Sequence, residues 1–173
     1  MKETLQDLKN RRSVRKFKPD MVAEEQLQEI LEAGKFAACG MGRQAGLMVV
    51  VQDKETMEQL RKMNAAIMGN PDMDPFYGAP MMIIVLADKN VRTYVEDGSL
   101  VMGNLMNAAY AVGVDSCWIH RAREEFESEE GKALLAKWGI EGDYAGIGHC
   151  ILGYSDGPLP EARPRKENFV VRV

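Results

Sequence analysis

The sequence is poor in the residues on which disulfide frameworks, metal sites and membrane spans depend. It has three cysteines, far apart and without a C-x-x-C pair, and two histidines among 173 residues. We therefore expect neither a disulfide framework nor a cysteine-rich zinc site. No apolar run approaches the roughly 18 to 20 residues that a membrane helix needs, and Met1-Lys2-Glu3 does not open an apolar signal peptide. These absences predict a cytoplasmic protein that binds neither a metal nor a membrane.

The motifs of several enzyme classes are missing as well. Neither His120 nor His149 lies in a G-x-S-x-G or H-E-x-x-H pattern, and no P-loop is present. Gly146-x-Gly148 lacks the third glycine of a dinucleotide fingerprint. His149 and Cys150 are neighbours on a predicted strand, so they point to opposite faces and are expected to be structural. No residue is singled out as catalytic; if the protein is an enzyme, we therefore expect a bound cofactor to supply the difficult chemistry.

Charge is distributed unevenly along the chain. The overall balance is 22 Lys plus Arg against 26 Asp plus Glu, a formal net charge of −4. Six basic residues and no acid lie between Lys9 and Lys18, and four more basic residues lie in the last eleven positions. Residues 19–162 hold 11 basic and 23 acidic residues, a net charge of −12.

Two basic ends on an acidic chain are explained most simply if both serve one compact anion, such as the phosphate of a small molecule. A broad nucleic-acid surface is disfavoured because the pI is near 5.3. The alternative is that both basic segments are solvated surface without a common ligand.

Hydrophobic periodicity predicts alternating helices and strands over one domain, residues 1–173. Helices are expected over 2–9, 24–38, 54–68, 95–112 and 124–138, and strands over 47–51, 81–87, 116–120 and 145–154. The alternation predicts an α/β layered architecture with helices on both faces of a sheet.

Three details accompany these elements. Asp53 is placed to cap the helix that follows it, and Gly113 to end the long apolar helix. The helix over 124–138 is polar, and its pairs Glu124-Glu125 and Glu129-Glu130 are expected to face solvent. Residues 168–173 have strand character, and we expect them to pair with a remote edge, on another subunit.

Five motifs, in order along most of the chain, resemble those of the FMN-dependent nitroreductase family. They are Arg11–Phe17 (R-R-S-V-R-K-F), Ala37–Gln44, Ala79–Ala87, Asn104–Ile119 and Arg163–Lys166. The resemblance implies a three-layer sandwich in which helices flank a mixed central sheet. It also implies a homodimer with FMN at the subunit interface and a C-terminal strand exchanged between subunits.

The family pattern implies which residues would hold FMN. Arg11, Ser13, Arg163 and Arg165 would bind the phosphate, and Arg12 would contribute through its backbone.

The flavin ring would meet residues from three segments. Arg15 would approach its N1/O2 edge, where a fixed positive charge favours the reduced anion. The other ring-lining residues implied are Cys39, Gly40, Gly42 and Gln44 from the partner subunit, and Ile119, His120 and Arg121 through their backbone N–H groups.

Two departures from the family pattern stand out. Gly42 replaces the usual asparagine, and Ala45-Gly46 replaces Pro-Trp, so one ring contact and one bulky wall are missing. The short connection from Met63 to Pro80 indicates a reduced lid over the flavin.

The leading hypothesis is an oxidoreductase that takes hydride from NADH or NADPH and reduces a small acceptor, such as a nitroaromatic or quinone, by a ping-pong mechanism. Reductive dehalogenation or flavin breakdown on the same scaffold is the first alternative. The others are a flavin-binding module without turnover and an anion-dependent interaction domain. The sequence does not choose between NADH and NADPH or name the physiological acceptor.

Overall fold

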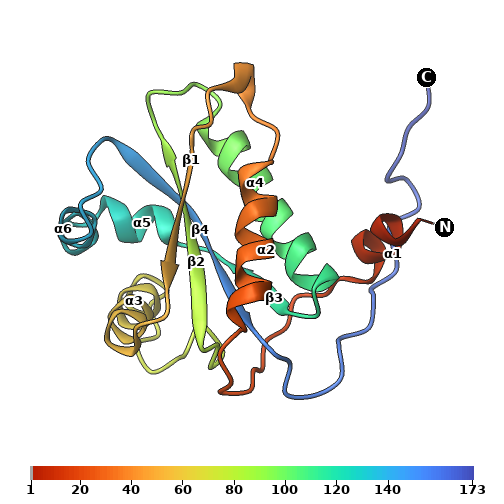
Figure 1. Cartoon of the computed structure of the whole chain (residues 1–173), viewed down its shortest axis with the longest axis horizontal. Coiled ribbons are helices and arrows are strands. Elements are labelled where there is room, and N and C mark those ends of the chain that lie inside the picture. The colour runs from red at the N-terminus through yellow and green to blue at the C-terminus, as the bar shows by residue number, and fades with distance from the viewer. Residues whose placement is uncertain (1) are drawn as a thin grey trace.

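Residues 2–173, which the computed structural model describes, form a four-stranded sheet covered by helices on both faces (Figure 1). The strands are β1 (Gly46–Val51), β2 (Met81–Asp88), β3 (Asp115–Ile119) and β4 (Tyr144–Gly153). The α-helices are α1 (Glu3–Asn10), α2 (Glu24–Lys35), α3 (Lys54–Ile67), α4 (Tyr94–Ala111), α5 (Ala122–Glu127) and α6 (Glu129–Lys137), and η1 (Gly40–Gly42) is a short 3-10 turn.

The sheet has the order β1-β2-β4-β3, and each neighbouring pair of strands is antiparallel. Val51 at the end of β1 pairs with Met82 near the start of β2, so α3 and the loop after it return to the same end of the sheet. A mixed sheet was expected. Parallel pairing is limited, among the described residues, to the single bridge between Ser13 and Ser116.

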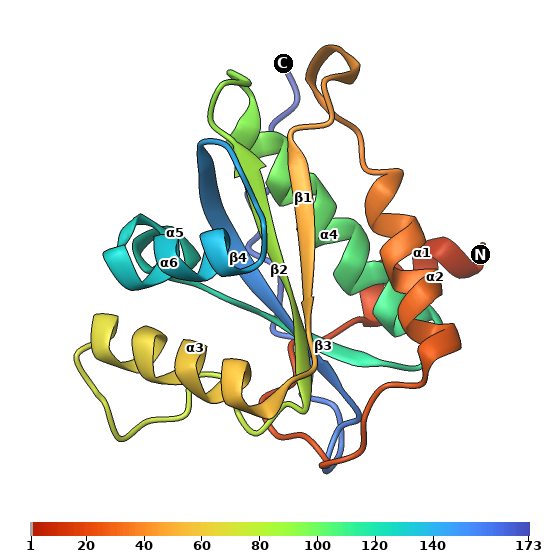
Figure 2. The same ribbon diagram turned by 60° about the vertical axis from the view of Figure 1, so that its left-hand side comes forward.

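Two apolar cores flank the sheet, one on each face. Helices α2 and α4 cover one face, and α3, α5 and α6 cover the other (Figure 2). Strand β2 is apolar throughout because its alternate residues enter different cores. Met82 and Ile84 face the α3 side, whereas Met81 and Ile83 face the α4 side. The layered architecture with helices on both faces is therefore confirmed.

Most predicted elements are present within a few residues of their expected bounds. Both oxygens of Asp53 accept hydrogen bonds from the first turn of α3, through the N–H groups of Glu55 and Thr56. Gly113 adopts a left-handed φ of 78° directly after α4, which is the conformation that ends a helix. None of the helices among residues 2–173 is long and apolar enough to cross a bilayer.

The polar helix expected over 124–138 is wrong in two respects. It is two helices, because Ser128 is extended, with ψ 158°, and caps α6 by accepting the N–H of Gly131. The first of them, α5, does not face solvent with all its acids, since Glu125 is fully buried.

Both ends of the chain lie outside this layered body (Figure 1). No residue of α1 is buried, and every residue from Pro158 to Val173 is exposed. The strand expected over 168–173 does not form within one chain, where the tail has no neighbouring edge to pair with. Its large apolar side chains, Phe169, Val170 and Val171, are at least two-thirds exposed.

Candidate functional site

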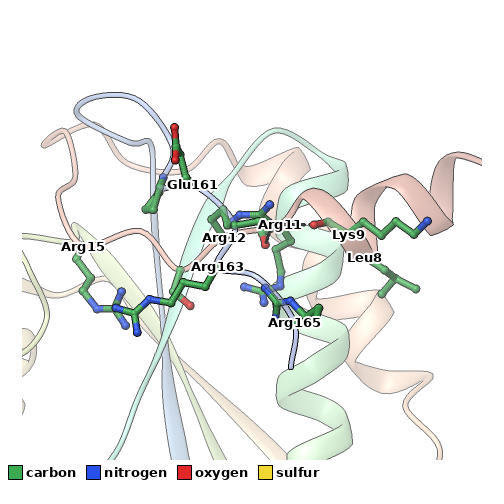
Figure 3. A pocket seen from close by; sticks show the side chains of 11 residues that line it. Leu8, Lys9, Arg11, Arg12, Arg15, Glu161, Arg163 and Arg165 are labelled. Atoms are coloured by element: carbon green, nitrogen blue, oxygen red, sulfur yellow. Dashed lines mark hydrogen bonds between the residues drawn. The ribbon is translucent and has the colours of Figure 1, made fainter. Parts of the chain in front are cut away.

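The two basic ends of the chain meet at one cavity. Its volume is about 780 Å³, and it lies between the segment that follows α1 and the start of the C-terminal tail (Figure 3). It is lined by Leu8, Lys9, Arg11, Arg12, Ser13, Arg15, Pro160, Glu161, Ala162, Arg163 and Arg165. We call this space the cationic cavity. All the residues that the sequence predicted from the R-x-S-x-R segment and the C-terminal arginines line it, namely Arg11, Arg12, Ser13, Arg15, Arg163 and Arg165.

Backbone pairing brings these distant segments together. The N–H of Val14 donates to the carbonyl of Ser116 at 3.0 Å, which fixes the segment after α1 to the edge of β3. A second bridge, from Phe17 to Ser155, ties the same segment to the chain just after β4. The tail therefore leaves the sheet close to this segment, and residues 160–163 and Arg165 border the same cavity as Arg11, Ser13 and Arg15.

The cationic cavity holds six cationic side chains and one carboxylate, Glu161. In the part of the chain that the structure describes, no carboxylate forms an ion pair with Arg11, Arg15, Arg163 or Arg165. The guanidinium groups of Arg15 and Arg163 point toward one another, and Arg165 lies next to Arg11 (Figure 3). Like charges held this close favour an anion between them.

Unpartnered buried donors strengthen this reading. Arg11 Nη1 and Arg12 Nε are each buried without a hydrogen-bond acceptor among the described residues, and so is the hydroxyl of the neighbouring Ser116. Arg12 uses its Nη1 to cap α1, donating to the carbonyls of Lys9 at 2.7 Å and Arg11 at 2.8 Å. A buried donor without an acceptor is costly, so a ligand oxygen that accepts from Arg11 would remove that cost.

The residues expected to line the ring from the partner subunit lie elsewhere. Cys39 and Gln44 border a separate cavity of about 160 Å³, together with the buried Asp97 of α4. Asp97 accepts the N–H of Gly40 at 2.9 Å and so holds the η1 turn to α4. Gly42 has a left-handed φ of 67°, which a glycine adopts without strain. One chain therefore does not bring this turn to the cationic cavity.

The segment Ile119–Arg121 also lies apart from the cationic cavity, at the end of β3. Ile119 is buried, whereas His120 is exposed and borders a cavity of about 350 Å³ with Trp118 and Arg123. Arg121 has a left-handed φ of 76° and is the N-cap residue directly before α5.

Neither buried thiol is suited to nucleophilic chemistry. Burial raises the pKa of Cys150 to about 12, and burial also raises the pKa of Cys117. The thiolate is therefore scarce at neutral pH in both residues. As predicted, His149 and Cys150 point to opposite faces, since His149 packs on Phe76 and Cys150 lies in the α4-side core.

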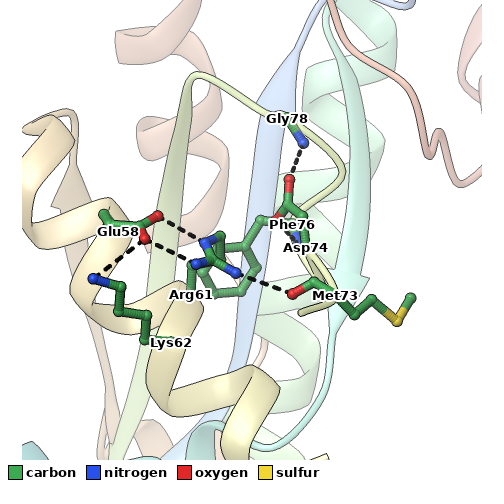
Figure 4. Close-up of polar contacts among 7 residues, drawn as sticks. All are labelled: Glu58, Arg61, Lys62, Met73, Asp74, Phe76 and Gly78. Carbon is green, nitrogen blue, oxygen red and sulfur yellow. Dashed lines mark hydrogen bonds and ion pairs between the residues drawn. The ribbon is translucent and has the colours of Figure 1, made fainter. Parts of the chain in front are cut away.

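A second large cavity differs from the cationic cavity in its polar groups. Its volume is about 420 Å³, and Glu58, Arg61 and Asp74 line it beside Phe76 (Figure 4). Arg61 makes a two-pronged pair with Glu58, at 2.7 and 2.8 Å, and donates to the carbonyl of Met73 at 3.1 Å. We call Glu58, Arg61, Lys62 and Asp74 the paired cluster. Its charged groups already have partners within the protein, so few of them are free to bind a ligand.

Sequence reasoning missed a buried polar group behind the end of β3. Asn64, Glu125 and His149 are all fully buried on the α3 side of the sheet. Glu125 was expected to face solvent. A signal was nevertheless present, because Asn64 interrupts the apolar stripe of α3 between Leu60 and Met63 on one side and Ala65 on the other.

The fold and the cationic cavity together define a class: a layered α+β protein in which both ends of the chain bring arginines to one cavity. Residues 8–154 match the model of the Nitroreductase family, and the chain belongs to that family.

Similar proteins agree with this assignment. A protein of Archaeoglobus fulgidus with the provisional name NADH dehydrogenase/NAD(P)H nitroreductase is 30% identical over 159 residues, which are 89% of this chain and 86% of that protein. The crystal structure of a Bacteroides fragilis nitroreductase with bound FMN superposes with a TM-score of 0.91 at 26% identity, and each chain is covered completely. An iodotyrosine deiodinase bound to FMN and 3-iodo-L-tyrosine superposes with a TM-score of 0.77 at 21% identity. The match covers 98% of this chain and 97% of the deiodinase chain, and it shows a shared fold alone.

Proposed function

We propose that the protein is a homodimeric FMN-dependent oxidoreductase that takes hydride from NADH or NADPH and reduces a small acceptor, such as a nitroaromatic or quinone. The observation that carries this proposal is the cationic cavity, in which buried guanidinium donors lack acceptors. Bound FMN would supply the redox chemistry by accepting a hydride and passing the electrons on in a ping-pong sequence. No acid or nucleophile of the protein is required.

The residues present fit the phosphate of FMN. Arg11, Arg163 and Arg165 would bind its oxygens through paired N–H groups, and the Ser13 hydroxyl would add one donor. The unpartnered Arg11 Nη1 would then gain an acceptor. Arg12 serves differently from the others, because its Nη1 is committed to the end of α1.

Three further groups would orient the ring. Arg15 lines the same cavity as the phosphate residues and would offset negative charge that develops on the pyrimidine edge of a reduced flavin. Residues 119–121 would contribute backbone N–H groups from the end of β3. The η1 turn, with Cys39, Gly40, Gly42 and Gln44, would contribute from the partner subunit, because it borders a different cavity within its own chain.

A second copy of the chain is the proposed partner of the exposed ends. Leu5 and Leu8 of α1 are each 51% exposed, and the apolar tail residues 169–171 contact nothing that would bury them within one chain. Contiguous exposed apolar surface marks interaction sites. We propose that the tail lies against the partner, so that the arginines at its start are held in place on the cationic cavity.

Visible absorption of the purified full chain tests the proposal. We expect the protein to be yellow as purified, or to retain yellow FMN after added flavin is removed by gel filtration, and to bleach when NADH or NADPH is added without oxygen. A protein that is colourless once free FMN has been removed would contradict the proposal. A yellow protein that neither nicotinamide bleaches would instead support a binding module without turnover.

Comparing acceptors separates the enzymatic alternatives. Nitroaromatic, quinone and halogenated compounds would each be offered to the reduced protein, and consumption of the first two alone would support the proposed reaction. Turnover of the halogenated compound alone would replace it with reductive dehalogenation. Binding of inorganic phosphate without any flavin spectrum would point to an anion-dependent interaction domain.

A further inference from the structure

The buried side chain of Asn64 hydrogen-bonds to the two residues just beyond β3, to the backbone of His120 and to the side chain of Arg121. Its amide Nδ2 donates to the carbonyl of His120 at 2.9 Å, and its Oδ1 accepts from Arg121 Nε at 2.9 Å. Asn64 is fully buried in α3, whereas His120 is exposed and Arg121 is half-buried, so both bonds are partly shielded from water. One amide therefore ties two successive residues of the chain to a helix that is 56 residues away in sequence.

These two residues make a turn that the backbone does not favour by itself. Arg121 has a φ of 76° and a ψ of 5°, a left-handed conformation that is unfavourable for a residue with a side chain. Such a conformation persists only when its surroundings impose it. The two bonds to Asn64 lie at this residue and at the one before it, where they oppose relaxation of the turn.

The helix that follows the turn, α5, also contacts strand β4. His149 Nε2 of β4 lies 2.7 Å from Glu125 Oε2 of α5, and both side chains are fully buried. The rings of Phe76 and Phe126 pack on His149, with centroids 5.3 and 6.5 Å away. Gly146 lets β4 approach α5 closely, because a Cβ there would lie 2.1 Å from the carbonyl oxygen of Ala122. Strand β4 therefore contacts α5 at two places, Ala122 at its start and Glu125 in its second half.

We infer that Asn64 is a positioning residue: it holds residues 119–121 in the one backbone conformation that presents their N–H groups to the flavin ring. The Glu125–His149 pair supports the same segment through α5. This inference rests on the proposed function, since it assigns a task within the ring-binding part of that site. Asn64 itself touches neither the cationic cavity nor the phosphate residues in it.

Hydrogen–deuterium exchange of the flavin-free protein tests the effect of these hydrogen bonds directly. The variant Asn64→Leu keeps the side-chain size but removes both bonds, and we expect faster exchange of the amides of residues 120–123. The matched control is Asn104→Leu, which removes a similar bond of 2.8 Å from an amide to the carbonyl of Ala33 between α4 and α2. The control is expected to leave residues 120–123 unchanged. Equal exchange of these residues in Asn64→Leu and the wild type would overturn the inference.

Flavin binding then tests whether Asn64 positions residues 119–121 for contact with the flavin ring. Asn64→Leu is expected to weaken binding of FMN and of riboflavin by the same factor, about tenfold, because the ring contacts are shared and the phosphate site is untouched. The ratio of the two dissociation constants should stay at its wild-type value. Unchanged affinity for both flavins would contradict the assignment to Asn64, and so would an equal loss in Asn104→Leu.

A second variant keeps the inference testable if the Asn64→Leu protein does not fold. Arg121→Asn removes the guanidinium that contacts Asn64, while asparagine tolerates the left-handed conformation. We expect the same changes in smaller degree, since the bond to His120 remains, and unaltered exchange at residues 120–123 would count against the inference. If the wild-type protein binds no flavin, the proposed function fails, whereas the exchange comparison still decides whether Asn64 holds the turn.

Discussion

Two arginines on this protein stand in opposite situations. Arg61, in the paired cluster, makes a two-pronged contact with Glu58 and donates a third bond to Met73. Arg11, in the cationic cavity, has a buried nitrogen without an acceptor and four other arginines around the same space. The difference teaches that the presence of charge does not mark a binding site. A binding site is indicated instead by charged groups whose hydrogen-bond donors have no acceptor within the protein.

Removing arginines from the cationic cavity should have the largest effect. Arg11→Ala combined with Arg165→Ala deletes charge-assisted bonds to the proposed phosphate, each worth about 10- to 100-fold in affinity. We expect FMN affinity to fall at least 100-fold, measured by fluorescence titration, while riboflavin affinity changes little. Arg61→Ala is the matched control from the paired cluster, with FMN affinity expected within about twofold of wild type. Similar losses in both variants would erase the distinction between the two regions.

Stabilisation by ligand should sharpen the same distinction. FMN at about 100 times its dissociation constant should add roughly 2.7 kcal/mol to the free energy of unfolding, seen as a higher melting temperature. Inorganic phosphate should give a smaller rise that weakens as salt is added, because the bond is largely electrostatic. At the same concentrations the Arg11→Ala, Arg165→Ala protein should gain at most about 0.4 kcal/mol from FMN, because its dissociation constant then equals or exceeds the FMN concentration, and should show no rise with phosphate, whereas Arg61→Ala should show both rises. A phosphate effect that survives in the double variant would place the anion elsewhere.

The smallest effect is expected in the paired cluster itself. The hydrogen bond from Arg61 lowers the pKa of Glu58 from 4.5 to about 2, so ionised Glu58 favours the folded state above pH 4.5 and loses that contribution as the pH falls toward 2. Glu58→Gln should therefore be slightly less stable than wild type at pH 7 and equal to it near pH 2. The contribution is small because the Glu58 carboxylate is exposed to solvent. Denaturant titrations across this pH range provide the measurement, and a gap that widens toward low pH would contradict the account.

The order of strands and helices followed from local patterns, because each pattern has a local cause. Residues 81–87 are apolar without alternation, and β2 is covered on both faces. Asp53 and Gly113 marked helix ends through their own backbone chemistry. The convergence of the two basic ends was one of two alternatives that the charge pattern left open, and the family resemblance favoured it.

What sequence could not supply depends on contacts between distant segments. Glu125 looked like a surface acid because its partner, His149, lies 24 positions further along and on another element. Ser128 is compatible in sequence with the middle of a helix, but in the structure its hydroxyl accepts the N–H of Gly131 and caps α6. Asn64 has no neighbour in sequence that reveals its bonds to residues 120 and 121. The antiparallel pairing of β1 and β2 depends likewise on the return of the α3 loop.

The most direct test of the central claim compares two ligands that differ only in a phosphate. The full chain, freed of flavin, would be titrated with FMN and with riboflavin under the same salt conditions. If the unmet charge of the cationic cavity exists to hold a phosphate, FMN should bind at least about 100-fold more tightly. Equal affinities for the two flavins would contradict that claim, whatever reaction the protein catalyses.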